Sequence, residues 1–495
     1  MRSAYGVETV RAAERELMAR LPDGALMQRA AAGLAAVCAQ LLRGGGPGRR
    51  PARRKVAGAR VGVLVGGGDN GGDALYAGAR LARRGAGVYA VLMDAGRAHG
   101  GGLAALLAAG GRVVERLPER LDLVLDGLLG IGGRGGLRPA AAALAAQADT
   151  ARAAGALVVA VDLPSGVDAD TGEVAGAVVG ADVTVTFGAY KPGLLISPGA
   201  TYAGTVRLVD IGLALPARPE VSALQDADVA GLLPVPGAES DKYRRGVVGV
   251  LAGSGQYPGA AVLAVAGALR GGAGAVRYVG PADQAVLARF PETLIGTGRV
   301  QAWVAGPGLG DGRLAEVERL LASDVPLLVD ADGLRGLSPE ALRRRTAPTL
   351  LTPHAGEAAA LLGVDRASVE AQRLRRAREL AERYGATVLL KGSTTVVCDP
   401  AGQVRVNPTG TPWLATAGSG DVLSGLAGSL LAAGLDPLDA ASAAAYLHGR
   451  AAHHAAADAP VTAQQVAEAL PAAWRTTSEA SGAGGRARRV GVSGT

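Results

Sequence analysis

Short apolar runs alternate with alanine-rich stretches along most of this chain of 495 residues. In the first half, the apolar runs lie at 61–65, 88–92, 121–125, 157–161, 183–187 and 206–209. Helical stretches near 72–84, 101–109 and 138–153 separate them, and two more, 7–20 and 24–42, come before them. This alternation is typical of α/β folds with parallel sheets. Because 49% of the residues are hydrophobic and the glycines follow no period of three, a disordered or collagen-like chain is excluded.

The same pattern starts again in the second half, with apolar runs at 247–252, 275–279, 302–305, 327–329, 349–351 and 388–390 and closing helices near 420–433 and 438–456. Between the halves, 213–222 (LALPARPEVS) has no periodicity and two prolines, which indicates a domain boundary. We therefore predict two Rossmann-like α/β domains, residues 1–215 and 222–475, joined by a linker at 216–221. Residues 476–495 are polar and glycine-rich, and we predict a disordered tail there.

The chain has 51 basic and 44 acidic residues, a net charge of +7, and one segment carries a positive charge of the same size. Residues 43–60 are rich in arginine and glycine and carry seven basic residues without an acid. A segment of this kind can contact nucleic acid or another anionic surface. The lack of aromatic residues for base stacking favours a solvated connector instead, so we do not expect a nucleic-acid partner.

Neither the cysteines nor the hydropathy pattern points to secretion or to a membrane. Cys38 and Cys398 are far apart and lack metal-ligand spacing, which is typical of reduced cysteines in a cytoplasmic protein. The N-terminus has no signal pattern. The uncharged run 246–269 is interrupted by GSGQYPG, which predicts a strand, a loop and a helix rather than a membrane span. We expect a soluble, homo-oligomeric protein without a membrane partner.

A glycine-rich loop with acidic and amide side chains follows the first apolar run. The sequence GGGDNGGD occupies 66–73 and leads into a helix. Glycines between a strand and a helix let backbone N–H groups approach a phosphate at the helix N-terminus. A tight turn alone does not require an amide and a carboxylate three residues apart, so Asn70 and Asp73 strengthen the prediction of a binding site.

Two later strand ends in the first half also carry acids. They are DGLLGIGG, which begins at Asp126, and DLPSG, which begins at Asp162. Since the carboxyl ends of parallel strands meet at one edge of a sheet, we expect Asp73, Asp126 and Asp162 to face one cleft. Each could instead be a helix cap or a turn former, which is a less economical account of all three together.

These three motifs, in this order, resemble the NAD(P)H-hydrate epimerase family over roughly residues 1–215. The resemblance implies a Rossmann-like α/β/α sandwich whose loops hold a hydrated nicotinamide cofactor, with 130–136 at its phosphates. The implied substrate-binding residues are Asp69, Asn70, Gly71, Gly72, Asp73, Gly130, Ile131, Gly132, Gly133, Arg134, Gly135, Gly136 and Asp162. It also implies a K⁺ ion held by Asn70, Asp126 and Ser165, and such oxygen ligands suit a hard cation rather than zinc.

The reaction that the resemblance implies is epimerisation at C6 of the hydrated dihydronicotinamide ring, with a carboxyl group as acid or base. Asp73, Asp126 and Asp162 are candidates, and Asp126 is the weakest if it holds the ion; we assign catalysis to Asp73 and Asp162. This chain has Asp69-Asn70 where the family more often has Asn-Asn. The change is harmless if residue 69 offers only its backbone, and it weakens phosphate binding if the side chain takes part.

The strongest chemical motif of the second half is GSGD, at 418–421. A Gly-Ser-Gly turn at a helix N-terminus offers backbone N–H groups to an anion, and Asp421 could accept a proton from an attacking hydroxyl. The motif resembles the phosphoryl-transfer site of ribokinase-like enzymes. An aspartate that merely caps a helix is equally compatible with the local sequence.

Motifs at other strand ends of the second half favour a binding site at GSGD over a simple helix cap. GSGQYPGAA, GPGLG, DADGL, TPHAGE and KGSTT precede GSGD, and together they resemble the ADP-dependent NAD(P)H-hydrate dehydratase family over roughly residues 222–475. The resemblance implies a ribokinase-like α/β domain. The implied substrate contacts are Ala261, Gly308, His354 and Asp421, and the implied nucleotide contacts are Lys391, Gly392, Ser393, Thr394, Thr395 and Gly420. His354 by itself would more often be a structural histidine, but its place beside these loops at the same sheet edge favours a ligand contact.

The dehydratase resemblance implies that ADP phosphorylates the C6 hydroxyl with Asp421 as base, and that phosphate then leaves. Mg²⁺ is expected with the phosphates, although no carboxylate cage for it is evident. The expected ligands are thus the hydrated forms of NADH and NADPH (NADHX and NADPHX) and ADP. The alternatives are a small-alcohol kinase of the hydroxyethylthiazole type in the second half, and a binding module without turnover in the first.

Overall fold

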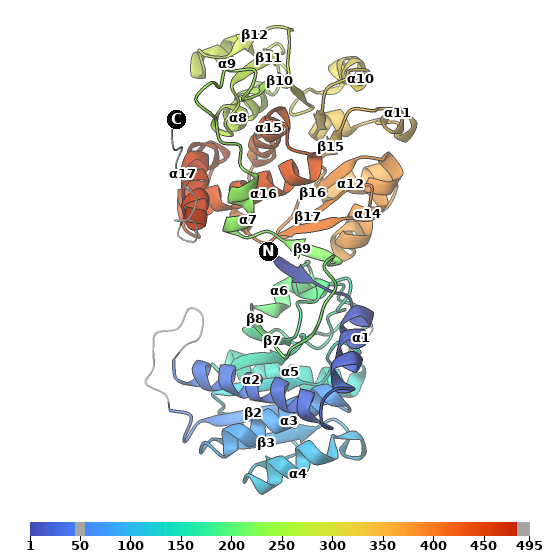
Figure 1. The fold of residues 1–495 in the computed structure, drawn as a ribbon, viewed down its shortest axis with the longest axis vertical. Helices are drawn as coiled ribbons and strands as arrows, with labels where there is room; N and C mark the ends of the chain where they lie inside the picture. The colour runs from blue at the N-terminus through green and yellow to red at the C-terminus, as the bar shows by residue number, and fades with distance from the viewer. Residues whose placement is uncertain (45–54, 134, 483–495) are drawn as a thin grey trace, which may run out of the picture. The chain divides into compact units, whose positions relative to one another are not determined.

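The computed structural model describes residues 1–44, 55–133 and 135–482, and it divides into two compact units (Figure 1). One unit is Ser3–Glu220, here called the first unit. The second unit combines Met1–Arg2 with the chain from Val221 onward. Of the basic segment 43–60, residues 45–54 lie outside the described residues, so the connector there stays a prediction.

The first unit is built on a seven-stranded sheet in which every pairing is parallel. Its spatial order is β4-β3-β2-β5-β6-β7-β8, which is the doubly wound order with a switch point between β2 and β5. The strands are β2 (Arg60–Val65), β3 (Gly87–Leu92), β4 (Arg112–Val113), β5 (Leu123–Gly127), β6 (Leu157–Val161), β7 (Val183–Phe187) and β8 (Thr205–Val209).

Helices cover both faces of this sheet. They are α1 (Val7–Met18), α2 (Ala25–Leu42), α3 (Asp69–Ala82), α4 (Gly100–Ala108), α5 (Pro139–Ala153) and α6 (Gly199–Ala203), with short 3₁₀ turns η1 (Ala95–Arg97) and η2 (Pro192–Leu194). Successive residues of β2 point to opposite faces: Val63 belongs to the core under α2 and α3, whereas Leu64 belongs to the core under α5. The expected α/β/α sandwich is confirmed.

Within the described residues, α2 is the one helix long and apolar enough to cross a membrane by length and composition. Half of it is buried, and Leu34 and Cys38 are fully enclosed in the core against β2 and α3. Packing against the sheet therefore accounts for its apolar composition.

The second unit contains a mixed sheet of eleven strands in the order β1-β9-β18-β17-β16-β15-β14-β13-β10-β11-β12. From β9 to β12 along this order, β17 pairs antiparallel with β16 and with β18, and the other pairings are parallel. The strands are β1 (Arg2–Ala4), β9 (Val221–Ala223), β10 (Val247–Leu251), β11 (Ala275–Val279), β12 (Leu294–Ile295), β13 (Ala302–Ala305), β14 (Leu327–Val329), β15 (Thr349–Leu351), β16 (Thr387–Leu390), β17 (Thr395–Cys398) and β18 (Val404–Asn407).

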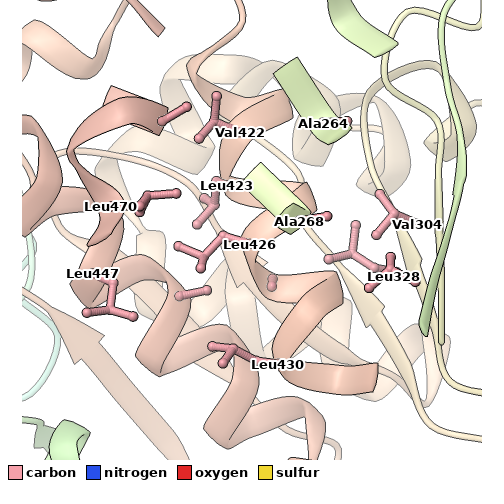
Figure 2. Packing of buried hydrophobic residues seen from close by; sticks show 14 of the residues in the cluster. Ala264, Ala268, Val304, Leu328, Val422, Leu423, Leu426, Leu430, Leu447 and Leu470 are labelled. Carbon is pink, nitrogen blue, oxygen red and sulfur yellow. The ribbon is translucent and has the colours of Figure 1, made fainter. Parts of the chain in front are cut away.

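The helices of the second unit are α7 (Asp226–Leu232), α8 (Pro258–Arg270), α9 (Asp283–Arg289), α10 (Leu314–Leu321), α11 (Pro339–Arg343), α12 (Ala355–Leu362), α13 (Arg366–Ala371), α14 (Arg373–Tyr384), α15 (Ser419–Ala432), α16 (Pro437–Ala456) and α17 (Ala463–Gly482), with 3₁₀ turns η3 (Asp311–Arg313), η4 (Ala331–Leu334) and η5 (Pro412–Leu414). Helices α8, α15, α16 and α17 share the main core with the sheet. Figure 2 shows Leu423, Leu426 and Leu430 of α15 in this core, near Ala264 and Ala268 of α8.

Some local features differ from what the sequence predicts. The run expected as a strand at 121–125 forms β5 two residues later, because Leu121 stays in the preceding loop and packs over Gly62. The antiparallel hairpin of β17 and β18 was not predicted. The tail expected to be disordered from 476 is helical up to Gly482, since Thr477 is fully buried; residues 483–495 lie outside the described part.

Candidate active sites at the carboxyl edges of the two sheets

The glycine loop of the first unit is pressed against the turn that follows β5. A Cβ atom on Gly66 would lie 1.8 Å from the carbonyl oxygen of Leu128, so only glycine fits there. The loop then enters α3, whose N-cap, Gly68, has a φ of +121° and provides no side-chain cap. The first N–H groups of α3 are thus left for an external acceptor, as in anion sites at helix N-termini.

Asn70, Asp126 and Ser165 come together beside this turn. The Ser165 hydroxyl donates to Asp126 Oδ1 (2.7 Å) and accepts from the Leu129 N–H (2.9 Å), and the Ser165 N–H donates to Asp126 Oδ2 (2.9 Å). The Asn70 amide lies against Gly130, where a Cβ atom would be 2.9 Å from Asn70 Oδ1. Burial raises the pKa of Asp126 to about 6, although the bonds from Ser165 oppose the shift.

The donor set of these three residues fits a hard monovalent cation. It offers one carboxylate, one amide oxygen and one hydroxyl, with no sulfur or imidazole ligand. The buried Asn70 Nδ2 has no hydrogen-bond partner, so that amide is oriented without using its donor. In the described ranges, no group of three or more His, Cys, Asp or Glu residues could hold a metal ion, which is compatible with a set built mainly on Asn and Ser.

Asp162 lies at the end of β6 and forms a buried ion pair that sequence reasoning missed. Lys191 Nζ donates to Asp162 Oδ1 (2.5 Å), to Thr186 Oγ1 (2.9 Å) and to the Phe187 carbonyl (3.1 Å). These three acceptors use all three ammonium protons, and the Lys191 side chain is only 1% exposed. Asp162 itself has a φ of +67°, a left-handed conformation that a non-glycine residue keeps at an energetic cost and that is enriched at functional sites.

Asp73 faces the same region from α3. Burial, together with the charges of Asp162, Asp69 and Glu14, raises the pKa of Asp73 well above its ordinary value. Its buried Oδ1 atom has no hydrogen-bond partner. Burial likewise raises the pKa of Glu14, on α1, a residue that no sequence motif had indicated. The first unit thus brings Asp73, Asp69, Glu14 and Asp162 into one region, with Lys191 bound to Asp162.

The other predicted cofactor contacts of the first unit surround this group. Gly71 and Gly72 are buried in the first turn of α3, where His99 and Met27 cover Gly72. Ile131 and Gly133 are half-buried, whereas Gly132, Gly135 and Gly136 are exposed in the loop after β5. Arg134 lies outside the described residues, so its predicted role stays a prediction.

In the second unit, Lys391 follows β16 and is anchored by acids from neighbouring strand ends. Its Nζ donates to Asp330 Oδ1 (2.6 Å) and lies 3.8 Å from Glu357 Oε2, while Ser424 donates to Asp330 Oδ2 (2.6 Å). Burial by itself lowers the pKa of Lys391, but Asp330, Glu357 and Asp421 outweigh it and the pKa is raised. Lys391 therefore stays protonated at the edge of the sheet.

Asp421 lies in the first turn of α15, close to this lysine. Burial, with Asp330 as the largest charge contribution, raises the pKa of Asp421 to about 7 despite the opposing charge of Lys391. The adjacent Gly420 lies over Lys391, since a Cβ atom there would be 3.3 Å from Nζ. The arrangement combines a fixed cation, a helix N-terminus and a carboxyl group that titrates near neutral pH.

The remaining predicted contacts of the second unit divide into side-chain and backbone positions. His354 Nδ1 accepts from the Gly356 and Glu357 N–H groups and caps α12, so the histidine has a structural role and more than half of its side chain stays exposed. The Ala261 side chain is fully buried, and only its backbone in the first turn of α8 can reach a ligand. Gly308 has a φ of +62° and packs on Tyr257.

Arg373 supports the KGSTT loop and was also missed. It is buried, it donates to the Lys391 carbonyl (2.5 Å), and it fills the space where a Cβ atom of Gly392 would be. Thr395 Oγ1 donates back to the Gly392 carbonyl (3.3 Å), and Thr394 is buried, while Ser393 is exposed. No sequence signal singled out Arg373, because it lies on α14 among several exposed arginines.

Each unit therefore brings buried carboxyl groups and an anchored lysine close to a glycine-rich loop at a helix N-terminus, an arrangement that is typical of enzymes acting on phosphate-bearing substrates. A family described as "YjeF-related protein N-terminus" matches residues 23–193, and one described as "NAD(P)H-hydrate dehydratase" matches residues 248–472. The chain belongs to the family of bifunctional NAD(P)H-hydrate repair enzymes. The predicted Rossmann-like first domain and ribokinase-like second domain are confirmed.

Among the similar proteins, several carry the name "Bifunctional NAD(P)H-hydrate repair enzyme Nnr". The protein of Mycobacterium leprae is 51% identical over 92% of this chain and 95% of its own length, and that of Mycobacterium tuberculosis is 50% identical over 89% and 92%. The protein of Corynebacterium glutamicum is 36% identical over 96% and 98%. A Bacillus subtilis ADP/ATP-dependent NAD(P)H-hydrate dehydratase, crystallised with ATP and Mg²⁺, is 30% identical over 52% of this chain and 99% of its own, with a TM-score of 0.49.

Proposed function

We propose that this chain repairs hydrated NADH and NADPH in two steps. The first unit interconverts the R and S forms of the hydrate at C6, and the second unit dehydrates the S form to NAD(P)H at the expense of ADP. One observation carries the proposal beyond family membership. Each unit places a carboxyl group of raised pKa, Asp73 or Asp421, beside an anion-binding loop.

Epimerisation requires the C6–O bond to break and to form again on the opposite face of the ring. Asp73 keeps its proton because it is buried among other acids, so it donates that proton to the departing hydroxyl oxygen, which leaves as water. When water adds to C6 from the opposite face, Asp162, whose Oδ1 is held by Lys191, accepts the released proton through its other oxygen. Two carboxyl groups in different environments thus act as acid and base.

Asn70, Asp126 and Ser165 would hold a K⁺ ion in the first unit. When bound, the ion supplies a positive charge beside the glycine loop, where the cofactor carries negative phosphates. Asn70, at the start of α3, also positions the loop against Gly130.

Dehydration needs a better leaving group than hydroxide. Asp421 takes the proton of the C6 hydroxyl, the oxygen attacks the terminal phosphoryl group of ADP, and AMP leaves. The C6–O bond of the phosphate ester then breaks, with loss of a proton from C5, and NAD(P)H and phosphate result. Lys391 and the KGSTT loop bind the nucleotide phosphates. Mg²⁺ would be held mainly by those phosphates, because Asp330 is engaged by Lys391 and Ser424.

A mixture of both hydrate epimers tests the proposal. We expect the enzyme with ADP and Mg²⁺ to restore the dihydronicotinamide absorbance of the whole pool. An Asp162→Asn variant should restore the S fraction at the same rate and then slow to the rate of spontaneous epimerisation. No recovery with ADP or ATP would overturn the proposal for the second unit and favour a small-alcohol kinase.

A further inference from the structure

The end of β3 carries an acid and an arginine whose chemistry neither the proposed reaction nor the motifs used so far explain. Asp94 and Arg97 form the turn η1 immediately after β3. The Met93 N–H donates to the Val65 carbonyl (2.9 Å), so this turn starts beside the point where the glycine loop begins.

Arg97 lies over the glycine loop. A Cβ atom on Gly67 would be 3.0 Å from Arg97 Cβ and 3.5 Å from Nε. The Arg97 side chain is exposed, and within the residues that the structure describes no hydrogen bond or ion pair engages its guanidinium. Asp94 Oδ1 accepts from the Gly96 N–H (2.9 Å), which holds the turn, while Oδ2 has no such bond in the described part of the chain.

The position of this turn in the sheet indicates which part of a dinucleotide it would contact. In the doubly wound strand order seen here, a dinucleotide lies across the switch point between β2 and β5, so its pyrophosphate would lie between the first glycine turn, which joins β2 to α3, and the loop after β5 that includes 130–136, which packs against that turn through Leu128 and Gly66. The end of the next strand, about 20 residues further on, then contacts the adenosine ribose, with an acid for a free 2′-hydroxyl or an arginine for a 2′-phosphate.

The position of the proposed catalytic residues determines which way the dinucleotide runs along the edge of the sheet. Asp162 follows β6, and β3 lies three strands away across β2 and β5, which is about 14 Å at the usual strand spacing. With the nicotinamide ring at Asp73 and Asp162, the adenosine half extends toward Arg97. We propose that Arg97 binds the 2′-phosphate of NADPHX and that Asp94 accepts a hydrogen bond from the 2′-hydroxyl of the NADHX ribose. This turn then sets the preference of the first unit for NADHX or NADPHX. The inference rests on the proposed epimerase reaction.

The test measures epimerisation of purified R forms of NADHX and NADPHX without ADP, so that the second unit does not turn over. Since a hydrogen-bonded ion pair to phosphate is worth about 1.5–3 kcal/mol, Arg97→Ala should lower kcat/KM at least about tenfold more for NADPHX than for NADHX, mainly through KM. Asp94→Asn keeps the acceptor that holds the turn and should shift the ratio the opposite way, toward NADPHX.

Arg84→Ala is the matched control, because Arg84 is an exposed arginine just beyond the opposite end of α3. Calorimetric titration with NADP⁺ and NAD⁺ gives a second measure that does not depend on turnover, and we expect the same shift in ratio. Equal effects of Arg97→Ala on both substrates, or no effect on either, would overturn the inference. A wild-type protein that epimerises neither substrate would instead refute the proposed epimerase.

Discussion

Asp73 and Asp421 lie in different units, yet burial has the same effect on both. Each loses hydration and lies near other acids, so each holds its proton to a higher pH than an exposed aspartate does. They differ in their nearest cation. Lys391 contributes to the balance at Asp421, whereas the charged contributors at Asp73 are acids. This supports a proton donor in the first unit and a proton acceptor near neutral pH in the second.

Because Asp421 is the proposed base, the rate of dehydration should increase with pH. A base works only when ionised, so kcat/KM of the dehydratase should rise with pH and level off above about 7, the pKa of Asp421. Asp421→Asn should lower kcat about 10²–10⁴-fold and remove this limb of the profile. Initial rates of absorbance recovery between pH 5.5 and 9 measure both effects. An unchanged profile in the variant would show that another group is the base.

Lys191 should matter for stability as well as for epimerisation. Lys191→Met leaves Asp162 buried without its cation, which should destabilise the first unit by about 3–5 kcal/mol. Hydrogen exchange of amides in β6 and β7 reports the first unit. The double variant Lys191→Met/Asp162→Asn should recover part of the stability but no epimerase activity. If activity returned along with stability, Asp162 would not be catalytic.

The strands and helices contribute to the two candidate sites mainly through the residues at their ends. In both sheets most functional side chains lie at strand ends or begin helices, whereas the strands themselves contribute mainly apolar residues to the core; Asp126, near the end of β5, and Thr186 of β7 are among the buried polar exceptions. Close approach of helices also depends on glycine. A Cβ atom on Gly425 of α15 would lie 1.9 Å from the Ala264 carbonyl oxygen of α8.

Gly425→Ala should therefore push α8 and α15 apart and destabilise the second unit by about 1–3 kcal/mol. All three tryptophans lie after residue 221, so their fluorescence in a denaturant titration reports this unit alone. Gly231→Ala, in α7, is the matched control, because nothing lies within 4 Å of its added Cβ atom. We expect no loss of stability from the control; equal losses in the two variants would show that packing between α8 and α15 is not the cause.

At the scale of the whole molecule, the two candidate sites belong to separate units with separate cores. If the epimers diffuse freely between sites, the two activities need not share a chain. An equal mixture of the Asp162→Asn and Asp421→Asn proteins should therefore convert the complete epimer pool, which neither variant does alone. Time courses at several enzyme concentrations measure this. Failure of the mixture, with each remaining single activity intact, would indicate that the epimers do not pass between chains.

Much of the fold and both loop systems could be predicted because they depend on local patterns. Apolar period, glycine turns and acids at strand ends are readable along the chain, and they singled out Asn70, Asp126 and Asp421 as candidates, whereas Ser165 was implied only by the family resemblance. The same reasoning placed β5 two residues early and began the disordered tail too soon, because Leu121 and Thr477 are positioned by packing that no local pattern shows.

The sequence by itself determined the layered α/β architecture, the family and the acids at the strand ends, since each follows from residues close together in the chain. Only the tertiary structure decided the partners: Lys191 for Asp162, Asp330 for Lys391, and Arg97 over Gly67. The physical reason is that pKa values and ion pairs depend on burial and on distances between residues far apart in sequence. The burial of these groups and the distances between them are set only when the sheets have formed.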